Sequence, residues 1–107
     1  MPNLIVIAKL TAKENHAEEV KVALLELIEP TLKEEGCFQY DCHQDLKNPH
    51  LFYFYEIWES AEHLKAHGMA EHIEAMRTKT KGLIVGLSLI HISSPRDQRG
   101  SRMPSSA

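Results

Sequence analysis

The sequence predicts an α+β fold in which helices cover one face of a four-stranded antiparallel sheet. Four stretches rich in β-branched and aromatic residues are expected to form strands, and the segments between them carry apolar residues at helical spacing. The resulting order is β-α-β-β-α-α-β, a ferredoxin-like arrangement with a doubled second helix. Right-handed crossovers place both helical segments on the same side of the sheet. The length of 107 residues and the 43% hydrophobic content fit one domain with one core.

The first strand and the first helical segment are expected over residues 4–11 and from about residue 15 to residue 33. One face of this strand carries Leu4, Val6, Ala8 and Leu10. Asn15 followed by Glu18 is typical of an N-cap with a capping box. Pro30 lacks a backbone donor, so we expect the helix to kink or restart there, and Gly36 is expected near its C-cap.

The second and third strands, over residues 37–44 and 50–58, are expected to pair through the turn that contains Asn48-Pro49. The second strand alternates Phe38, Tyr40 and Cys42 with polar residues. One face of the third strand carries Phe52, Phe54, Glu56 and Trp58, and the other carries Leu51, Tyr53, Tyr55 and Ile57. Both faces are hydrophobic, but the chain's own helices can cover only one. We therefore expect a homodimer formed through the open sheet face.

Residues 60–92 supply the remaining elements. Ser60 is expected to cap a short helix that Gly68 ends, and a further helix is expected from about residue 70 to residue 78. Residues 83–92 read as the last strand. We expect one domain over residues 1–92. Residues 93–107 consist of turn formers, charges and serines, which predicts a disordered tail. The composition of this tail differs from that of residues 1–92, as expected of a non-native extension.

Charge and composition exclude several classes of partner. The net charge of −3 disfavours a nucleic-acid binder, which needs a basic surface. No apolar run is long enough for a membrane span, and the N-terminus lacks a basic region and a cleavage site. Cys37 and Cys42 lie five residues apart, which on a regular strand puts them on opposite faces, so we expect reduced thiols. Together these features predict a cytoplasmic protein.

Several motifs together resemble the antibiotic biosynthesis monooxygenase family, whose pattern is roughly E-x-G-C-x-x-Y, F-x-x-E-x-W-x-S and H-x-x-x-x-H. The residues that carry the resemblance are Glu35-Gly36-Cys37, Tyr40, Pro49, Phe54-Tyr55-Glu56-Ile57-Trp58-Glu59-Ser60, His67 and His72. The resemblance spans residue 3 to about residue 92. It implies a dimeric α/β barrel, and better-known members oxidise phenols, anthrones or quinols with O2 and no metal or flavin. Haem-degrading relatives carry an Asn in the first strand, which residues 7–9 lack.

A cofactor-free oxygenase must deprotonate its substrate, because triplet O2 reacts slowly with ordinary closed-shell molecules. His67 and His72 are the candidate catalytic bases, since His titrates nearest physiological pH. The expected substrate-binding walls are Trp58, Tyr40, Phe54 and Phe52. These residues also have structural interpretations. The two histidines can cap helix ends or be solvated, and the aromatic residues can simply pack in the core. Glu56 is expected to be structural and paired with Lys9 or a helix residue, because buried carboxylates are usually paired.

A metal site is not expected. His63 and His67 have a ligand-like i, i+4 spacing, but the sequence places no third ligand beside them. The first hypothesis is therefore a dimeric, cofactor-independent monooxygenase that acts on a quinol, anthrone or polyphenol. Two alternatives stay open: an isomerase of a small oxo-sugar phosphate, and a non-catalytic dimeric ligand-binding module. A sugar phosphate needs a cationic rim, for which Lys9, Arg77, Lys79 and Lys81 are available, whereas a quinol needs flat aromatic walls.

Overall fold

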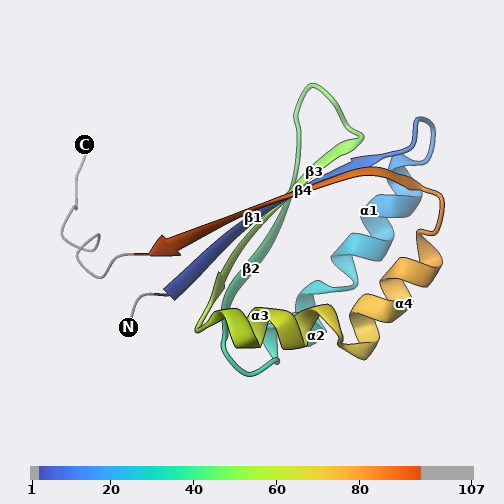
Figure 1. Cartoon of the computed structure of the whole chain (residues 1–107). Helices are drawn as coiled ribbons and strands as arrows, with labels where there is room; N and C mark the ends of the chain where they lie inside the picture. Colours follow the sequence, from blue (N-terminus) through green and yellow to red (C-terminus); the bar gives the residue numbers. More distant parts are fainter. Residues whose placement is uncertain (1–2, 95–107) are drawn as a thin grey trace, which may run out of the picture.

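The computed structural model describes residues 3–94, which form one sheet with its helices on a single face (Figure 1). The strands are β1 (Asn3–Ala12), β2 (Cys37–Gln44), β3 (Leu51–Trp58) and β4 (Ile84–Ser94). The helices are α1 (Ala17–Leu25), α2 (Ile28–Leu32), α3 (Ala61–Gly68) and α4 (Glu71–Lys79). The strand order is β2-β3-β1-β4 and every pair is antiparallel. The predicted element order and α+β class are confirmed.

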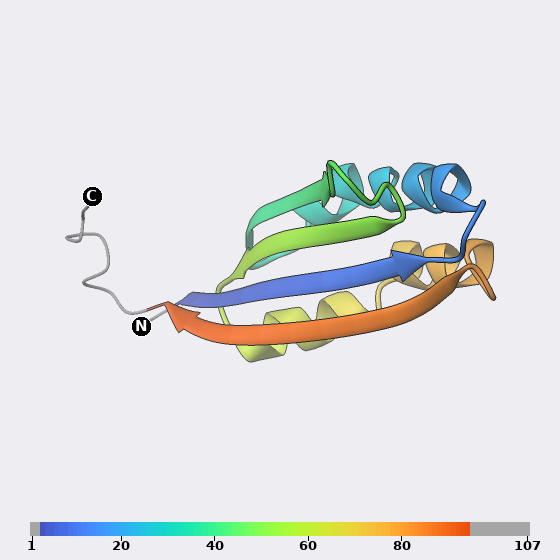
Figure 2. The same ribbon diagram turned by 90° about the horizontal axis from the view of Figure 1, so that it is seen from above.

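The helices divide the covered face of the sheet between them. Seen from above, α1 and α2 lie over the β2–β3 half, whereas α3 and α4 lie over the β1–β4 half (Figure 2). The single helical layer therefore consists of two helix pairs side by side, and the loop after α2 reaches α3 and α4 through Glu34. Among the described residues, no helix is both long enough and apolar enough to cross a membrane.

Burial alternates along the central strands as the sequence predicts. On β3 the helix-facing residues Phe52, Phe54, Glu56 and Trp58 are all buried. Their neighbours on the open face, including Tyr53 and Tyr55, are only half-buried in the isolated chain. Each large apolar side chain buried in this way contributes about 1.5–3 kcal/mol to folding. The core therefore fixes which face of β3 points toward the helices.

The first helix begins later than predicted, and the expected capping box is wrong. Asn15 has a positive φ of 72°, a conformation that Asn tolerates better than most residues, and α1 starts only after His16. The His16 side chain makes no capping hydrogen bond to the backbone. It bonds instead to Glu19, with 2.5 Å between Nδ1 and Oε1.

The interruption associated with Pro30 lies upstream of the proline. In one continuous helix the Glu26 carbonyl would receive no hydrogen bond from Pro30 and would clash with its ring. The chain breaks at Glu26 and Leu27 instead, and α2 restarts at Ile28. Pro30 then occupies the third position of α2, where an N–H would have no helical acceptor.

A bulge in β2 overturns the expected placement of the cysteines on opposite faces. Cys37 pairs with Trp58 and the next ladder partner is Gln39, so Phe38 is extra and 56% exposed. Both Cys37 and Cys42 consequently pack against the core, and burial is the main cause that raises the pKa of each thiol to about 11. Their ladder partners lie four positions apart on β3, about 13 Å, so the two free cysteines remain out of bonding range.

The β4 strand extends to Ser94, two residues beyond the predicted domain end at residue 92. Most of the predicted disordered tail, residues 95–107, lies outside the described residues.

Met76 is only half-buried, whereas Ile73, which was predicted to be buried with it in the core, is buried.

Gly36 is required at the entrance to β2. Its φ is +82°, and a Cβ at this position would lie 2.3 Å from Cγ of His63. Gly82 has a similar φ of +79° but nothing within 4 Å of its Cβ position, which makes it a matched control. Replacing either by Ala is expected to cost about 1–2 kcal/mol of backbone strain. Gly36→Ala should cost about 1–3 kcal/mol more, because His63 must move. Urea unfolding of both variants measures the difference, and equal losses would contradict this account of Gly36.

Candidate active site

The site is a hydrogen-bonded cluster of Glu34, His67 and His72 at the junction of the two helix pairs, α1–α2 and α3–α4. Glu34 Oε2 lies 2.7 Å from Nδ1 of His67 and 2.7 Å from Nε2 of His72. A carboxylate oxygen can only accept hydrogen bonds, so both ring nitrogens donate to it. The carboxylate thus fixes which nitrogen of each imidazole carries the proton.

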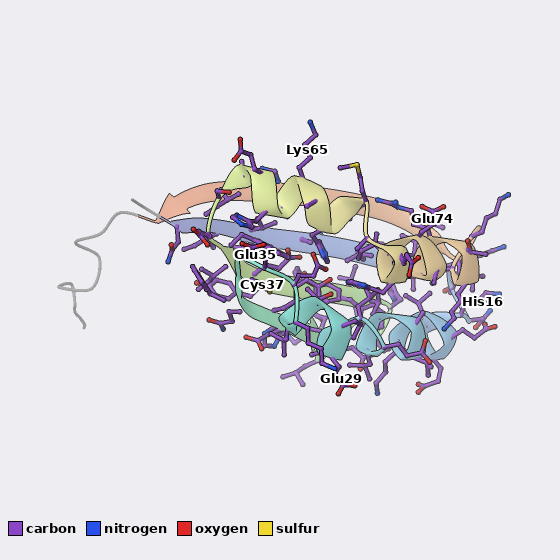
Figure 3. The ribbon with its side chains drawn as sticks, turned by 90° about the horizontal axis from the view of Figure 1, so that it is seen from below. His16, Glu29, Glu35, Cys37, Lys65 and Glu74 are labelled. Atoms are coloured by element: carbon purple, nitrogen blue, oxygen red, sulfur yellow. The ribbon has the colours of Figure 1, made fainter. Side chains whose placement is uncertain are left out.

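Local structure holds each member in place. His67 lies in the last turn of α3, whose start is fixed by Ser60: its Oγ accepts a hydrogen bond from the backbone N–H of His63. His72 lies in the first turn of α4. Glu34 lies in the loop between α2 and β2, and its N–H donates to the Thr31 carbonyl. Figure 3 shows Glu35 of this loop and Cys37 at the start of β2 on one side of α3, and Lys65 on the other side, pointing into solvent.

His67 is the most enclosed of the three residues. It is 7% exposed, and its ring packs against Trp58 at a centroid distance of 4.8 Å and against Tyr40 edge-on at 5.3 Å. Burial lowers the pKa of His67 below its ordinary value, and its hydrogen bond with Glu34 partly opposes this. His67 is therefore a neutral imidazole near neutral pH. With Nδ1–H donating to Glu34, Nε2 carries the free lone pair.

A cavity of about 660 Å³ opens beside His67, between the β1–β4 half of the sheet and helices α3 and α4. Most of its wall is apolar, with Val6, Ala8 and Leu10 from β1, Leu87 and Leu89 from β4, and Ile73 and Met76 from α4. Tyr40, Phe54, Glu56 and His67 also line it. The volume lies within the range of small-molecule sites.

The structure brings some of the predicted site residues together and leaves others outside the cavity. Phe52, Trp58 and His72 are not part of its lining. Trp58 is fully buried against the His67 ring, and His72 reaches the site through Glu34. Phe52 is 1% exposed and belongs to the core, where it pairs with Leu10.

Glu56 has a different partner from the one expected. Trp58 Nε1 donates to Oε1 of Glu56 over 2.8 Å, both side chains being buried. The predicted pairing with Lys9 is wrong, because Lys9 is exposed and lies between Ala8 and Leu10, which face the helices. Burial is the main cause that raises the pKa of Glu56 to about 7, and Trp58 opposes the shift. A carboxyl group that titrates near neutral pH therefore faces the cavity.

The raised pKa of Glu56 predicts a pH-dependent loss of stability. The folded state holds the Glu56 proton more tightly than the unfolded chain, whose carboxyl group has an ordinary pKa of 4.5. The unfolding free energy should therefore fall as the pH rises from about 4.5 through about 7. Glu56→Gln keeps an acceptor for Trp58 and removes the charge. Between pH 5 and pH 8 the wild type should lose about 2.5 kcal/mol relative to this variant in urea titrations. Parallel pH profiles would contradict the assignment.

Sequence reasoning missed Glu34 as a site residue. The pattern E-x-G-C places its glutamate at Glu34, two residues before Gly36, whereas the sequence comparison above used the adjacent Glu35. Glu34 is also the carboxylate of a possible ligand set, since one donor atom each from Glu34, His67 and His72 lie within 4.8 Å of one another. His63, considered above for a metal site, instead bonds to Ser60.

Comparison with known proteins shows the family of this chain. The family model for antibiotic biosynthesis monooxygenases matches residues 3–79. The chain belongs to this family. A relative from Escherichia coli named a probable quinol monooxygenase is 29% identical over 96 residues, covering 80% of this chain and 92% of the relative.

Solved structures from other organisms are similar to this chain in fold and sequence. A protein from Pseudomonas aeruginosa is 33% identical with a TM-score of 0.84, and the match covers 89% of this chain and 96% of that one. A protein from Methanosarcina mazei is 27% identical with a TM-score of 0.79, covering 89% and 95% respectively. The ferredoxin-like fold predicted from the sequence is thus shared with these structures.

Proposed function

We propose that this protein is a cofactor-independent monooxygenase that oxidises a quinol, anthrone or polyphenol with O2, with His67 as the base. The observation that carries the proposal is the pairing of His67 with Glu34 beside an apolar cavity. The E. coli relative's name gives further support. His72 shares the same carboxylate and acts as a positioning residue for Glu34.

The chemistry follows from the position of His67. Nε2 accepts the proton of a substrate hydroxyl group, and the imidazolium that forms is stabilised by Glu34 through Nδ1–H. The resulting phenolate is electron-rich and transfers an electron to O2, so that the two radicals can combine. The radicals form a carbon-bound peroxide, which takes back the proton held by His67. Its O–O bond then breaks as the same carbon loses its hydrogen, so that one oxygen atom stays on the substrate as a carbonyl and the other leaves as water. The apolar wall excludes water, which strengthens these electrostatic interactions.

The cavity wall favours a flat aromatic substrate over an oxo-sugar phosphate. Of the four cations considered for a phosphate rim, only Arg77 and Lys81 line the cavity. Lys79 pairs with Glu26 over 2.5 Å, and Lys9 is exposed beyond the helix-covered face. Arg77 donates to the Gly68 carbonyl and to Glu74. Tyr40 and Phe54, whose ring centroids lie 4.9 Å apart, offer aromatic surface instead.

We also propose that two chains pair through the open sheet face and complete a dimeric α/β barrel in the cytoplasm. Tyr55, Ile7 and Ile90 form a cross-strand row on that face, and Ile90 is 53% exposed in the single chain. Light scattering should give twice the chain mass. Ile7→Lys should give a folded monomer, because a buried unpaired charge opposes association. A monomeric wild type would contradict the pairing.

Oxygen uptake tests the proposed activity. Purified protein treated with a chelator is mixed with reduced menadiol, anthrone or catechol-type substrates in an oxygen electrode. We expect uptake that scales with protein concentration for at least one of them and survives the chelator. Uptake no faster than autoxidation across the panel would contradict the oxygenase and favour the isomerase or a binding module.

A further inference from the structure

We propose that Glu34, His67 and His72 also form a binding site for one divalent transition metal ion, Zn²⁺ in particular. The inference goes beyond the oxygenase, which needs no metal. The three side chains offer two imidazole nitrogens and one carboxylate oxygen, a donor set that suits Zn²⁺ and Co²⁺. They come from three separate elements and meet at one point.

The distances fit such an ion with small side-chain movements. Ligand atoms that share one Zn²⁺ at about 2.1 Å lie roughly 3.0–3.4 Å apart. In this structure Glu34 Oε2 lies 2.7 Å from each ring nitrogen. Each of these two contacts therefore needs to open by only about half an ångström, and the two ring nitrogens, which lie within 4.8 Å of each other, must come within the same range.

Charge and tautomer also favour a cation. Glu34 brings one negative charge to two imidazoles, and the nearby cation Arg77 is engaged by Glu74 and by the Gly68 carbonyl. An ion on His67 Nδ1 replaces the proton that now points at Glu34, and that proton moves to Nε2 through solvent exchange. The His72 side chain is 23% exposed and that of Glu34 is 16% exposed, so water can reach the remaining coordination positions from solvent.

Occupancy by a metal has a consequence for catalysis, which rests on the proposed function. With Nδ1 bound to the ion and Nε2 protonated, His67 has no lone pair for the substrate proton. The ion should therefore inhibit oxygen uptake reversibly, and a chelator should restore it. Binding itself is measurable without any substrate, so failure of the metal site and failure of the oxygenase are distinguishable.

Calorimetric titration of the chelator-stripped, full-length protein with Zn²⁺ tests the site. We expect one ion per chain with a Kd in the micromolar range or below, as well as visible absorption bands when Co²⁺ is used. Glu34→Gln and His72→Ala should each weaken binding at least tenfold. His16→Ala removes an exposed histidine that also pairs with a glutamate, and it should leave the Kd unchanged.

Two results would overturn the proposal. One is the absence of Zn²⁺ binding by the wild type at millimolar concentration. The other is an equal Kd in wild type, Glu34→Gln and His72→Ala, which would place the ion elsewhere on the surface. Circular dichroism of each metal-free variant checks that it is folded, and Glu34→Gln preserves the shape of the side chain. A variant that does not fold is replaced by His72→Gln, for which the same tenfold weakening is expected.

Discussion

His67→Ala is expected to reduce kcat for quinol oxidation by about 10²–10⁴, the usual contribution of a general base. The reduction follows from losing the only one of the two candidate bases that lines the cavity. Because the His67 ring is buried against Trp58 and Tyr40, the variant also loses packing, so its folded fraction must be measured by circular dichroism. Initial rates of oxygen uptake with a saturating quinol measure kcat.

His43→Ala is the matched control for this variant. His43 is exposed near the end of β2 and pairs with Tyr53 in the ladder, so its removal should leave kcat within about twofold. Full activity in folded His67→Ala would contradict the assignment of His67 as the base, whatever the behaviour of His72→Ala.

Trp58→Ala is expected to lower the free energy of unfolding by about 3–5 kcal/mol, as for other large core truncations. Trp58 is 0% exposed and is among the largest fully buried side chains. Its removal leaves a void beside His67 and takes away the hydrogen-bond donor of Glu56. Urea unfolding at a fixed pH measures the loss.

Trp58→Phe separates the effect of lost packing from the effect of the lost hydrogen bond to Glu56. Phe retains most of the packing against His67 but cannot donate to Glu56, so this variant should lose about 1–3 kcal/mol. It should also raise the pKa of Glu56 further, because the Trp58 hydrogen bond lowers that pKa. If Trp58→Ala and Trp58→Phe lose the same amount, packing of the indole contributes less than its burial implies.

The fold could be predicted from the sequence because its signals are local. Alternation along β3 correctly separated Phe54 and Trp58 from Tyr53 and Tyr55, and Ser60 and Gly68 correctly bounded α3. Local departures from regular strand geometry could not be predicted from the sequence. The bulge at Phe38 reverses which face Cys37 occupies, and nothing in the composition of β2 marks it.

The candidate site was predicted only in part, because its connections are tertiary. His67 and His72 stand out as histidines at helix ends, but their partner Glu34 lies 33 and 38 residues away in the sequence. Glu34 lies in a run of charged residues, a pattern typical of a solvent-exposed surface. The hydrogen-bond partner of Glu56 depends on how its side chain packs in the folded protein. The donor is Trp58, two residues further along the same strand.

A crystal structure with a bound hydroxynaphthoquinone, the product expected when one oxygen atom enters a naphthoquinol, tests the central claim most directly. The account predicts a flat ring in the cavity between β1 and α4, with the hydroxyl oxygen of the product donating to Nε2 of His67 over about 2.6–3.2 Å. His67 Nδ1 should remain bonded to Glu34. A quinone bound on the open sheet face, or in the cavity with its oxygens beyond reach of His67, would contradict the account.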